Sequence, residues 1–250
     1  MAASGDHSID LPDITLSFTL QQWESELLLV TGGRPPTVDW LRETATGRTL
    51  WCADHGVDVC RRAELCPVYL IGDADSADAE AWQWAERQGA VSETFPPEKD
   101  FTDTELALQK MRKERPGPFV AIIGAFGGRL DHAFSTLYSL VGSGLPGLLA
   151  DDKELLLLLR SGDAITGQTK KTPLALSLLP LSKECSGVSL TGVRWPLCDA
   201  RLRLSECREQ SSGIPRRAFF PLPAKRLSGP LCVLENTAMV TDWDDECSIK

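Results

Sequence analysis

The first 145 or so residues of the chain alternate short runs of Val, Ile and Leu with segments of helical periodicity. We predict strands at residues 27–30, 49–52, 68–71, 91–95 and 119–123, and helices at 36–45, 57–63, 77–88, 102–113 and about 130–141. Strands that are buried on both faces appear as continuous apolar runs, and helical crossovers join parallel strands. The alternation therefore predicts an α/β domain with a parallel, Rossmann-like sheet that helices cover on both faces.

The pattern changes after about residue 150. Short strand-like runs follow at residues 154–159, 164–166, 174–179, 188–190, 200–204, 230–234 and 238–241, without a helical period between them. This spacing is typical of a small all-β sandwich or barrel. We predict an N-terminal extension at residues 1–26, an α/β domain at 27–148 and a smaller β-sandwich domain at 149–250, with an irregular loop at 208–229.

Charge and composition argue against nucleic-acid, membrane and zinc binding. The chain carries 26 Lys and Arg against 35 Asp and Glu, a net charge of −9. Nucleic-acid binding usually shows as a basic surface, so this balance argues against it. Its apolar runs are too short or too interrupted to cross a bilayer. The eight cysteines include no C-x-x-C pair, which argues against a zinc ribbon or a thioredoxin-type site. We expect a cytoplasmic protein with reduced thiols that binds neither nucleic acid nor membrane.

Four polar clusters follow predicted strands. They are residues 53–56 (ADHG), 72–76 (GDADS), 99–103 (KDFTD) and 124–132 (GAFGGRLDH). Ligands of open α/β sheets bind beyond the carboxyl ends of the strands, so one fold would bring these clusters to one edge. Carboxylates suit Mg²⁺, whereas Lys, Arg and a Gly-Gly turn suit phosphate. The clusters predict binding of Mg²⁺ and a polyphosphate for phosphoryl-type transfer, without the G-x-x-x-x-G-K-[ST] loop of Walker-type enzymes.

Three of the four clusters also have a purely structural explanation. Asp75 or Ser76 would serve as the N-cap of the helix predicted at 77–88. Thr102 and Glu105 have the spacing of a capping box. The Gly-Gly-Arg stretch of the last cluster fits a plain turn with a surface arginine. The functional interpretation therefore depends on all the clusters meeting at one place.

In this order and spacing, the clusters resemble the motifs of the thiamin pyrophosphokinase family: A-D-G-G, G-D-x-D-S, K/Q-D-x-T-D and G-G-R-x-D-H. The segments SLLPLS at residues 177–182 and GVSLTGVRWPL at 187–197 are similar to the thiamin-binding β-domain of that family. The resemblance covers about residues 27–241. It implies a homodimeric, Mg²⁺-dependent enzyme that transfers pyrophosphate from ATP to the hydroxyethyl group of thiamin and releases AMP.

The resemblance also implies roles for individual residues. Metal binding is implied for Asp73, Asp75, Asp100 and Asp103, and catalysis for Asp73, Asp75, Asp100 and Arg129. Either Asp100 or Asp75 would assist removal of the hydroxyl proton, and Arg129 would neutralise charge on the phosphoryl oxygens. Nucleotide binding is implied for Asp54, Lys99, Thr102, Gly127, Gly128, Arg129, Asp131 and His132. Thiamin binding is implied for Ser212 and for Trp195 near a partner subunit, although Trp195 fits a β-domain core position equally well.

Two departures from the family pattern leave other functions open. His55 stands where the family has glycine, and the late Ser-Asn pair of the family has two candidate counterparts, at residues 211–213 and 228–229. One alternative is a non-catalytic thiamin- or nucleotide-binding protein on the same fold. The other is a metal-dependent nucleotide-sugar transferase, because those enzymes also use D-x-D after a strand. The sugar-transferase interpretation leaves residues 99–103 and 127–132 unexplained.

Overall fold

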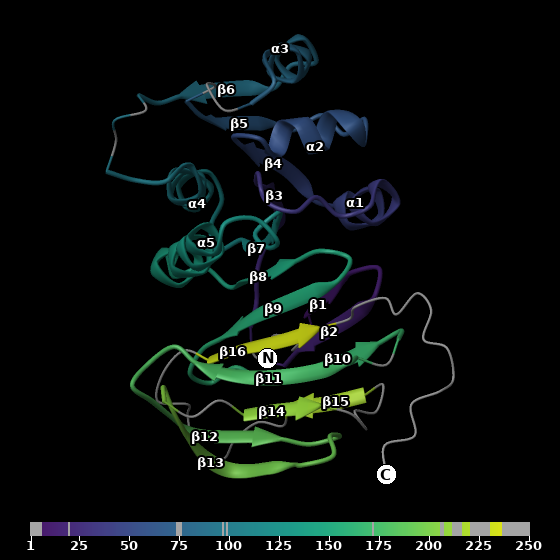
Figure 1. Cartoon of the computed structure of the whole chain (residues 1–250), viewed down its shortest axis with the longest axis vertical. Helices are drawn as coiled ribbons and strands as arrows, with labels where there is room; N and C mark the ends of the chain where they lie inside the picture. Colours follow the sequence, from purple (N-terminus) through teal and green to yellow (C-terminus); the bar gives the residue numbers. More distant parts are fainter. Residues whose placement is uncertain are drawn as a thin grey trace, which may run out of the picture.

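A ten-stranded sheet forms the centre of the computed structural model (Figure 1). The structure describes residues 7–19, 21–73, 77–96, 98, 100–171 and 173–205, and the backbone of strands 208–211, 217–220 and 231–236. The strand order is β14-β11-β16-β9-β8-β7-β3-β4-β5-β6. Neighbours pair in parallel from β8 to β6, and they pair antiparallel from β8 through β9 to β14.

The parallel part of the sheet follows the predicted strand–helix alternation. Its strands are β3 (Glu26–Val30), β4 (Thr49–Ala53), β5 (Tyr69–Gly72), β6 (Val91–Thr94), β7 (Phe119–Ile123) and β8 (Gly147–Ala150). Its helices are α1 (Val38–Ala45), α2 (Gly56–Arg62), α3 (Ala79–Arg87), α4 (Asp103–Glu114) and α5 (Leu130–Ser143). The predicted α/β architecture is confirmed, and β8 is an additional strand. Among the described residues, no helix is long and apolar enough to cross a bilayer.

The side chains of β3 alternate between two cores. Leu28 and Val30 belong to the core beneath α1, α2 and α3, whereas Leu27 and Leu29 belong to the core beneath α4 and α5. Figure 1 shows these two sets of helices on opposite faces of the sheet. Because successive side chains of a strand point to opposite faces, an uninterrupted apolar run fills both cores at once.

The order of the parallel strands reverses between β3 and β7. The chain runs outward from β3 through β4 and β5 to β6, and then crosses back to β7 on the other side of β3. The segments after β3 and β7 remain hydrogen-bonded, with Thr31 N donating to Ile123 O at 2.8 Å and Gly33 N to Gly124 O at 2.7 Å. Ligands of open α/β sheets bind at such a point of reversal.

Within the described residues, the antiparallel half contains strands at all the predicted positions and two further strands. β9 (Glu154–Leu159), β10 (Ile165–Thr169), β11 (Ala175–Pro180), β12 (Glu184–Leu190), β13 (Leu197–Arg203) and β16 (Leu231–Asn236) match expected runs. The prediction of an irregular loop at 208–229 is wrong at two segments, which form β14 (Arg208–Ser211) and β15 (Arg217–Phe220). β14 pairs with β11, and β15 pairs with β10. The backbone hydrogen bonds of these strands are made with strands that lie elsewhere in the sequence, so no local pattern predicts them. The run predicted at 238–241 lies outside the described residues.

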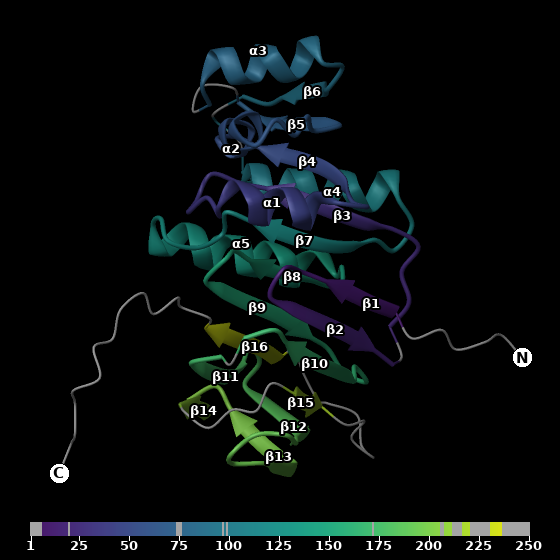
Figure 2. The same ribbon diagram turned by 90° about the vertical axis from the view of Figure 1, so that its right-hand side faces the viewer.

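Two strands precede the parallel sheet. β1 (His7–Asp10) and β2 (Ile14–Phe18) form a hairpin, and β2 pairs with β10. The N-terminal extension therefore contributes to the second sheet, β1-β2-β10-β15, beside the hairpin β12-β13 (Figure 2). The division into domains at 26/27 and 148/149 stays a prediction; the second position falls within β8.

Asp13 ties the N-terminal hairpin to the α/β half. Trp40 Nε1 of α1 donates to Asp13 Oδ2 at 2.9 Å, and Trp40 is only 7% exposed. Removing the carboxylate would leave a buried N–H without its acceptor, which costs about 1–3 kcal/mol. We expect Asp13→Ala to lower the free energy of unfolding by about 2 kcal/mol in urea denaturation. Asp13→Asn keeps an acceptor and is the control; equal losses in both variants would contradict the hydrogen-bond explanation.

Candidate functional site

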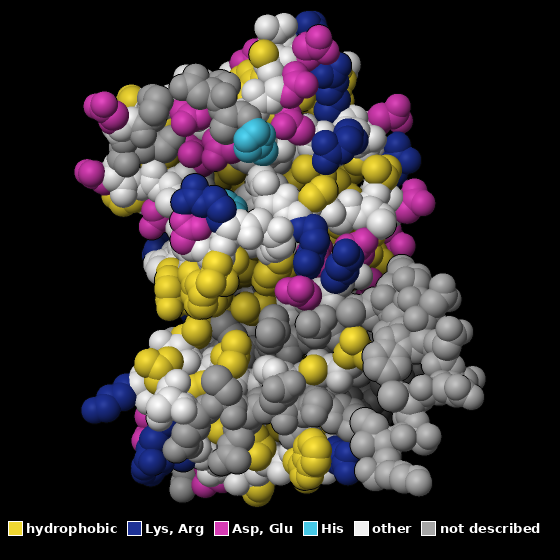
Figure 3. Space-filling view, viewed as in Figure 1, with side chains coloured by type: hydrophobic (Ala, Val, Ile, Leu, Met, Phe, Trp, Pro, Cys, Tyr) yellow, Lys and Arg dark blue, Asp and Glu magenta, His cyan; other side chains and the backbone are white. Residues whose placement is uncertain are grey.

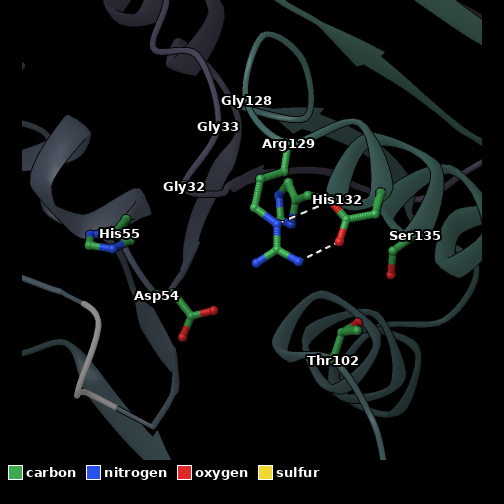
Figure 4. A pocket seen from close by; sticks show the side chains of 10 residues that line it. Gly32, Gly33, Asp54, His55, Thr102, Gly128, Arg129, His132 and Ser135 are labelled. Carbon is green, nitrogen blue, oxygen red and sulfur yellow. Dashed lines mark hydrogen bonds and ion pairs between the residues drawn. The ribbon is translucent and has the colours of Figure 1, made fainter.

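A cavity of about 550 Å³ opens at the carboxyl end of the parallel strands (Figure 4). Segments that follow β3, β4 and β7 contribute Gly32, Gly33, Asp54, His55, Gly128 and Arg129. The N-terminal parts of α4 and α5 contribute Thr102, Asp131, His132 and Ser135. Residues that are far apart in the sequence therefore share one edge of the sheet, as the strand-end argument predicted.

Two glycines allow the segments after β3 and β7 to meet at the base of this cavity. A Cβ on Gly33 would lie 2.1 Å from Gly124 O, so the two backbones leave no room for a side chain. Gly127 has a φ of +69°, which favours glycine, and a Cβ there would lie 2.6 Å from Arg34 Cβ. A Cβ on Gly128, in contrast, would meet only Gly33 Cα at 3.8 Å.

These spacings predict different tolerances at Gly33 and Gly128. We expect Gly33→Ala to lower the free energy of unfolding by about 2–3 kcal/mol, because the new methyl group forces two backbones apart. Gly128→Ala adds the same group in open space and should stay within about 1 kcal/mol of the parent protein. Urea denaturation of the two variants measures the difference. Equal losses would show that backbone approach at Gly33 is not the cause.

Arg129 presents an exposed guanidinium at the rim of the cavity. Its Nε donates to Asp131 Oδ1 at 3.1 Å and its Nη2 contacts Asp131 Oδ2 (Figure 4). The hydrogen bond, and then the opposite charge, raise the pKa of Arg129, and hydrogen bonding from Arg129 lowers the pKa of Asp131. The side chains are 82% and 64% exposed, so water screens the pair. A phosphate could therefore replace Asp131 at little cost.

Thr102 is both the cap of α4 and part of the cavity wall. Its Oγ1 accepts from Glu105 N at 3.2 Å, and Glu105 Oε2 accepts from Thr102 N at 2.9 Å. The predicted capping box is confirmed. Because Thr102 also lines the cavity, the cap holds the positive end of the α4 dipole beside it.

Two predicted carboxylates follow neighbouring strands. Asp54 follows β4, lines the cavity and has a left-handed φ of +46°, which Asp tolerates better than most residues. Asp73 follows β5. A Cβ on Gly72 would lie 2.3 Å from Asp54 Oδ1, so the Asp54 carboxylate packs against the backbone just before Asp73. Parallel pairing of β4 with β5 brings these positions together.

The remaining predicted residues of this edge differ in placement. Asp73, Asp100, Asp103 and Gly127 do not line the cavity; Asp100 is exposed, and Asp103 is the first residue of α4. Asp75, Lys99 and Ser212 lie outside the described residues. Within the described part of the chain, no group of three or more His, Cys, Asp or Glu side chains is placed to hold a metal ion. The four-carboxylate metal site, which includes Asp75, stays a prediction.

Trp195 is remote from the cavity of its own chain. It lies in the connection between β12 and β13, at the end of the molecule opposite to α3 (Figure 1). Its side chain is 48% exposed, and the Arg194 guanidinium lies 4.6 Å from its ring. The alternative that Trp195 is a β-domain core residue is therefore wrong.

Helix α3 is capped by Asp78. The Asp78 Oδ1 atom accepts from Glu80 N at 2.7 Å and from Ala81 N at 3.3 Å. The predicted N-cap at Asp75 or Ser76 is wrong, because the helix begins later than residue 77. Asp75 and Ser76 themselves lie outside the described residues.

His55 fits its backbone position without strain. Its φ of −53° is helical, so the position does not require the glycine of the family pattern. Its Nδ1 lies 3.2 Å from Asp58 Oδ2. Figure 4 shows the ring to one side of the cavity, away from Arg129.

The sequence analysis did not assign Gly32, Gly33, His55 and Ser135 to the site. The glycines directly follow a predicted strand, so the strand-end argument could have found them. To assign Ser135 to the site, one has to know which face of α5 points to the cavity, because Ser135 lies on the same helix face as Asp131 and His132.

Known proteins are similar to this chain in sequence and in fold. The family model described as thiamin pyrophosphokinase, catalytic domain, matches residues 42–145, a range that includes all four polar clusters. Thiamine pyrophosphokinase of Bacillus subtilis is 28% identical over 182 residues, covering 70% of this chain and 83% of that protein.

Solved structures extend the likeness over most of the chain. The crystal structure of a thiamin pyrophosphokinase family protein from Enterococcus faecalis has a TM-score of 0.71 and 26% identity, covering 86% of this chain and 100% of that one. That of thiamine pyrophosphokinase from Bacillus subtilis has a TM-score of 0.70 and 23% identity, with the same coverage. The chain is therefore similar to thiamin pyrophosphokinases in fold over most of its length, and its residues 42–145 match the model of their catalytic domain.

Proposed function

We propose that this chain transfers pyrophosphate from ATP to the hydroxyethyl group of thiamin, giving thiamin diphosphate and AMP. The observation that carries the proposal is the meeting of the glycine turns, Asp54, Thr102 and Arg129 at the point where the strand order reverses. In this reaction the thiamin hydroxyl oxygen bonds to the β-phosphorus of ATP. The bond from that phosphorus to the α-phosphate oxygen breaks, and the hydroxyl proton passes to a base.

The cavity would hold the ATP triphosphate. Gly33 and Gly128 let phosphate oxygens approach the backbone, and the capped N-terminus of α4 at Thr102 favours negative charge. Arg129 would exchange Asp131 for phosphoryl oxygens, whose charge grows in the transition state. Asp131 and His132 would organise the same turn.

The carboxylate of Asp73, which follows β5, suits a hard divalent cation. Mg²⁺ takes carboxylate oxygens and keeps water or phosphate in its other positions, and Asp54 packs against the backbone before Asp73. We propose that Asp73, Asp75, Asp100 and Asp103 hold Mg²⁺, with Asp54 and Lys99 at the nucleotide. The bound ion would neutralise charge on the triphosphate. Asp100 or Asp75 would accept the hydroxyl proton.

Thiamin would bind with the help of a second subunit. Trp195 is exposed and far from the cavity of its own chain, so we propose a homodimer in which Trp195 and Ser212 of one subunit complete the thiamin site of the other. Leu130, Phe134 and Tyr138 of α5 are 73%, 49% and 59% exposed and form a hydrophobic patch beside the cavity (Figure 3). Burial of this patch would favour pairing. Sedimentation equilibrium tests the dimer, and a purely monomeric protein would contradict it.

A cytoplasmic location is also part of the proposal. The described cysteines form no disulfide bond, and thiols stay reduced in the cytosol. The net charge of −9 supports small-molecule partners in preference to nucleic acid.

The decisive experiment is incubation of the protein with ATP, Mg²⁺ and thiamin. We expect AMP and thiamin diphosphate to form in equal amounts. Absence of both products at high enzyme concentration would contradict the proposal. Thiamin binding by calorimetry without transfer would indicate the non-catalytic alternative, and transfer from a nucleotide sugar but not from ATP would indicate the sugar transferase. The similarity to thiamin pyrophosphokinases favours neither alternative.

A further inference from the structure

Arg34 lies behind the cavity and touches two segments of its base. Its backbone N–H donates to Phe126 O at 2.6 Å. The stem of its side chain covers Gly127, since a Cβ on that glycine would lie 2.6 Å from Arg34 Cβ and 2.9 Å from its Cδ. Arg34 does not line the cavity itself. It supports the turn that carries Gly128 and Arg129 from behind.

The guanidinium of Arg34 is fixed by a buried carboxylate in a third segment. Asp151 directly follows β8, and its side chain is 0% exposed. Its Oδ2 lies 2.8 Å from Arg34 Nε and 2.6 Å from Arg34 Nη2. Its Oδ1 accepts from the backbone N–H groups of Lys153 and Glu154 at 2.8 and 2.9 Å. One oxygen of the Asp151 carboxylate thus contacts Arg34, and the other is fixed by the backbone of the turn between β8 and β9.

Glu154 completes the set of charges around Arg34. Its Oε1 lies 3.2 Å from Arg34 Nη2. Burial by itself would lower the pKa of Arg34. The hydrogen bonds and charges of Asp151 and Glu154 outweigh this effect, so the pKa is raised overall. The arginine therefore stays charged and paired, and a planar guanidinium held in this way has little freedom to turn.

A second ion pair at the other end of β3 provides an internal comparison. Arg48 Nη2 lies 2.9 Å from Glu26 Oε2, and the Arg48 side chain is 5% exposed. Arg48 also donates to Thr44 O and Asp10 O. This pair is also largely buried, but here the arginine is the more buried partner, whereas Asp151 is the more buried partner of Arg34. It lies at the amino end of the strand, away from the cavity.

We infer that Arg34 and Asp151 are positioning residues for the nucleotide site. Their ion pair holds the Gly127 turn in place against the segment after β3, and it links this geometry to the start of the antiparallel half. The inference rests on the proposed binding of ATP. A displacement of the order of 1 Å in a residue that positions reacting groups can lower a reaction rate by about 10²-fold.

The test separates positioning from simple stabilisation. The double variant Arg34→Met with Asp151→Leu replaces the pair by apolar side chains, an exchange that buried ion pairs often tolerate without loss of stability. We expect it to unfold in urea near the parent midpoint, yet to bind a non-hydrolysable ATP analogue with Mg²⁺ at least about tenfold more weakly in calorimetry. Glu26→Gln is the control, with lowered stability and an unchanged Kd.

A milder variant covers the case in which the double variant does not fold. Arg34→Lys keeps the charge but lacks the Nε contact to Asp151, and we again expect a Kd about tenfold higher. Parent-like affinity in a folded double variant, or in Arg34→Lys if the double variant is unfolded, would overturn the inference. Failure of the parent protein to bind the analogue would overturn ATP binding itself, and the inference with it.

Discussion

Substitution of Arg129 by glutamine is expected to lower the rate of AMP formation by about 10³-fold, with the fold intact. An arginine that neutralises charge on a transferring phosphoryl group contributes about 10³–10⁵ to the rate. Arg129 stands on the cavity rim, and its side chain is 82% exposed. Because water already screens its pair with Asp131, the substitution removes little folding stability.

Steady-state kinetics at saturating Mg²⁺ measures this effect. Arg61→Gln is the matched control, since Arg61 of α2 forms a comparable exposed pair with Glu80 at 3.2 Å. We expect the control to keep parent-like kcat and KM. A small change in kcat for Arg129→Gln, similar to that of the control, would remove Arg129 from the transition-state contacts.

Asp73→Asn is expected to reduce turnover by about 10²–10³-fold without unfolding the protein. The amide has nearly the shape of the carboxylate, but it lacks the negative charge that favours binding of Mg²⁺. Asp73 is half-buried directly after β5, so it is placed beside Asp54 at the end of the neighbouring strand. A higher Mg²⁺ concentration should be needed for half-maximal activity.

The measurement is a Mg²⁺ titration of activity, together with thermal unfolding. Asp39→Asn, an exposed position in the first turn of α1, controls for the loss of one negative charge. Near-normal activity of Asp73→Asn would exclude Asp73 from the metal site. Loss of activity that only accompanies unfolding would likewise contradict the proposed role.

The strand–helix order of the α/β half was readable from local patterns. The run at 119–123 is β7 with the predicted bounds, because a strand buried on both faces needs apolar residues without interruption. Helices α4 and α5 begin within a residue of the predicted positions. These features depend on neighbouring residues alone.

Elements without a local signal were missed. β8 has the sequence GLLA, whose glycine and preceding proline suggested a linker. β2 was taken as part of an extension, yet it pairs with β10, about 150 residues later. Pairing between distant segments depends on the assembled sheets. A short strand has too few residues for its sequence pattern to predict such pairing.

The same division holds for the site. The sequence by itself determined that polar clusters follow the strands and therefore gather at one edge, because the carboxyl ends of parallel strands must lie together. Only the tertiary structure decided that Gly33 and Gly128 line the cavity while Gly127 lies behind it, against Arg34. Arg34 and Asp151 are 117 residues apart. Strand ends are local features of a sequence, whereas a buried charge finds its partner only through the packing that removes both from water.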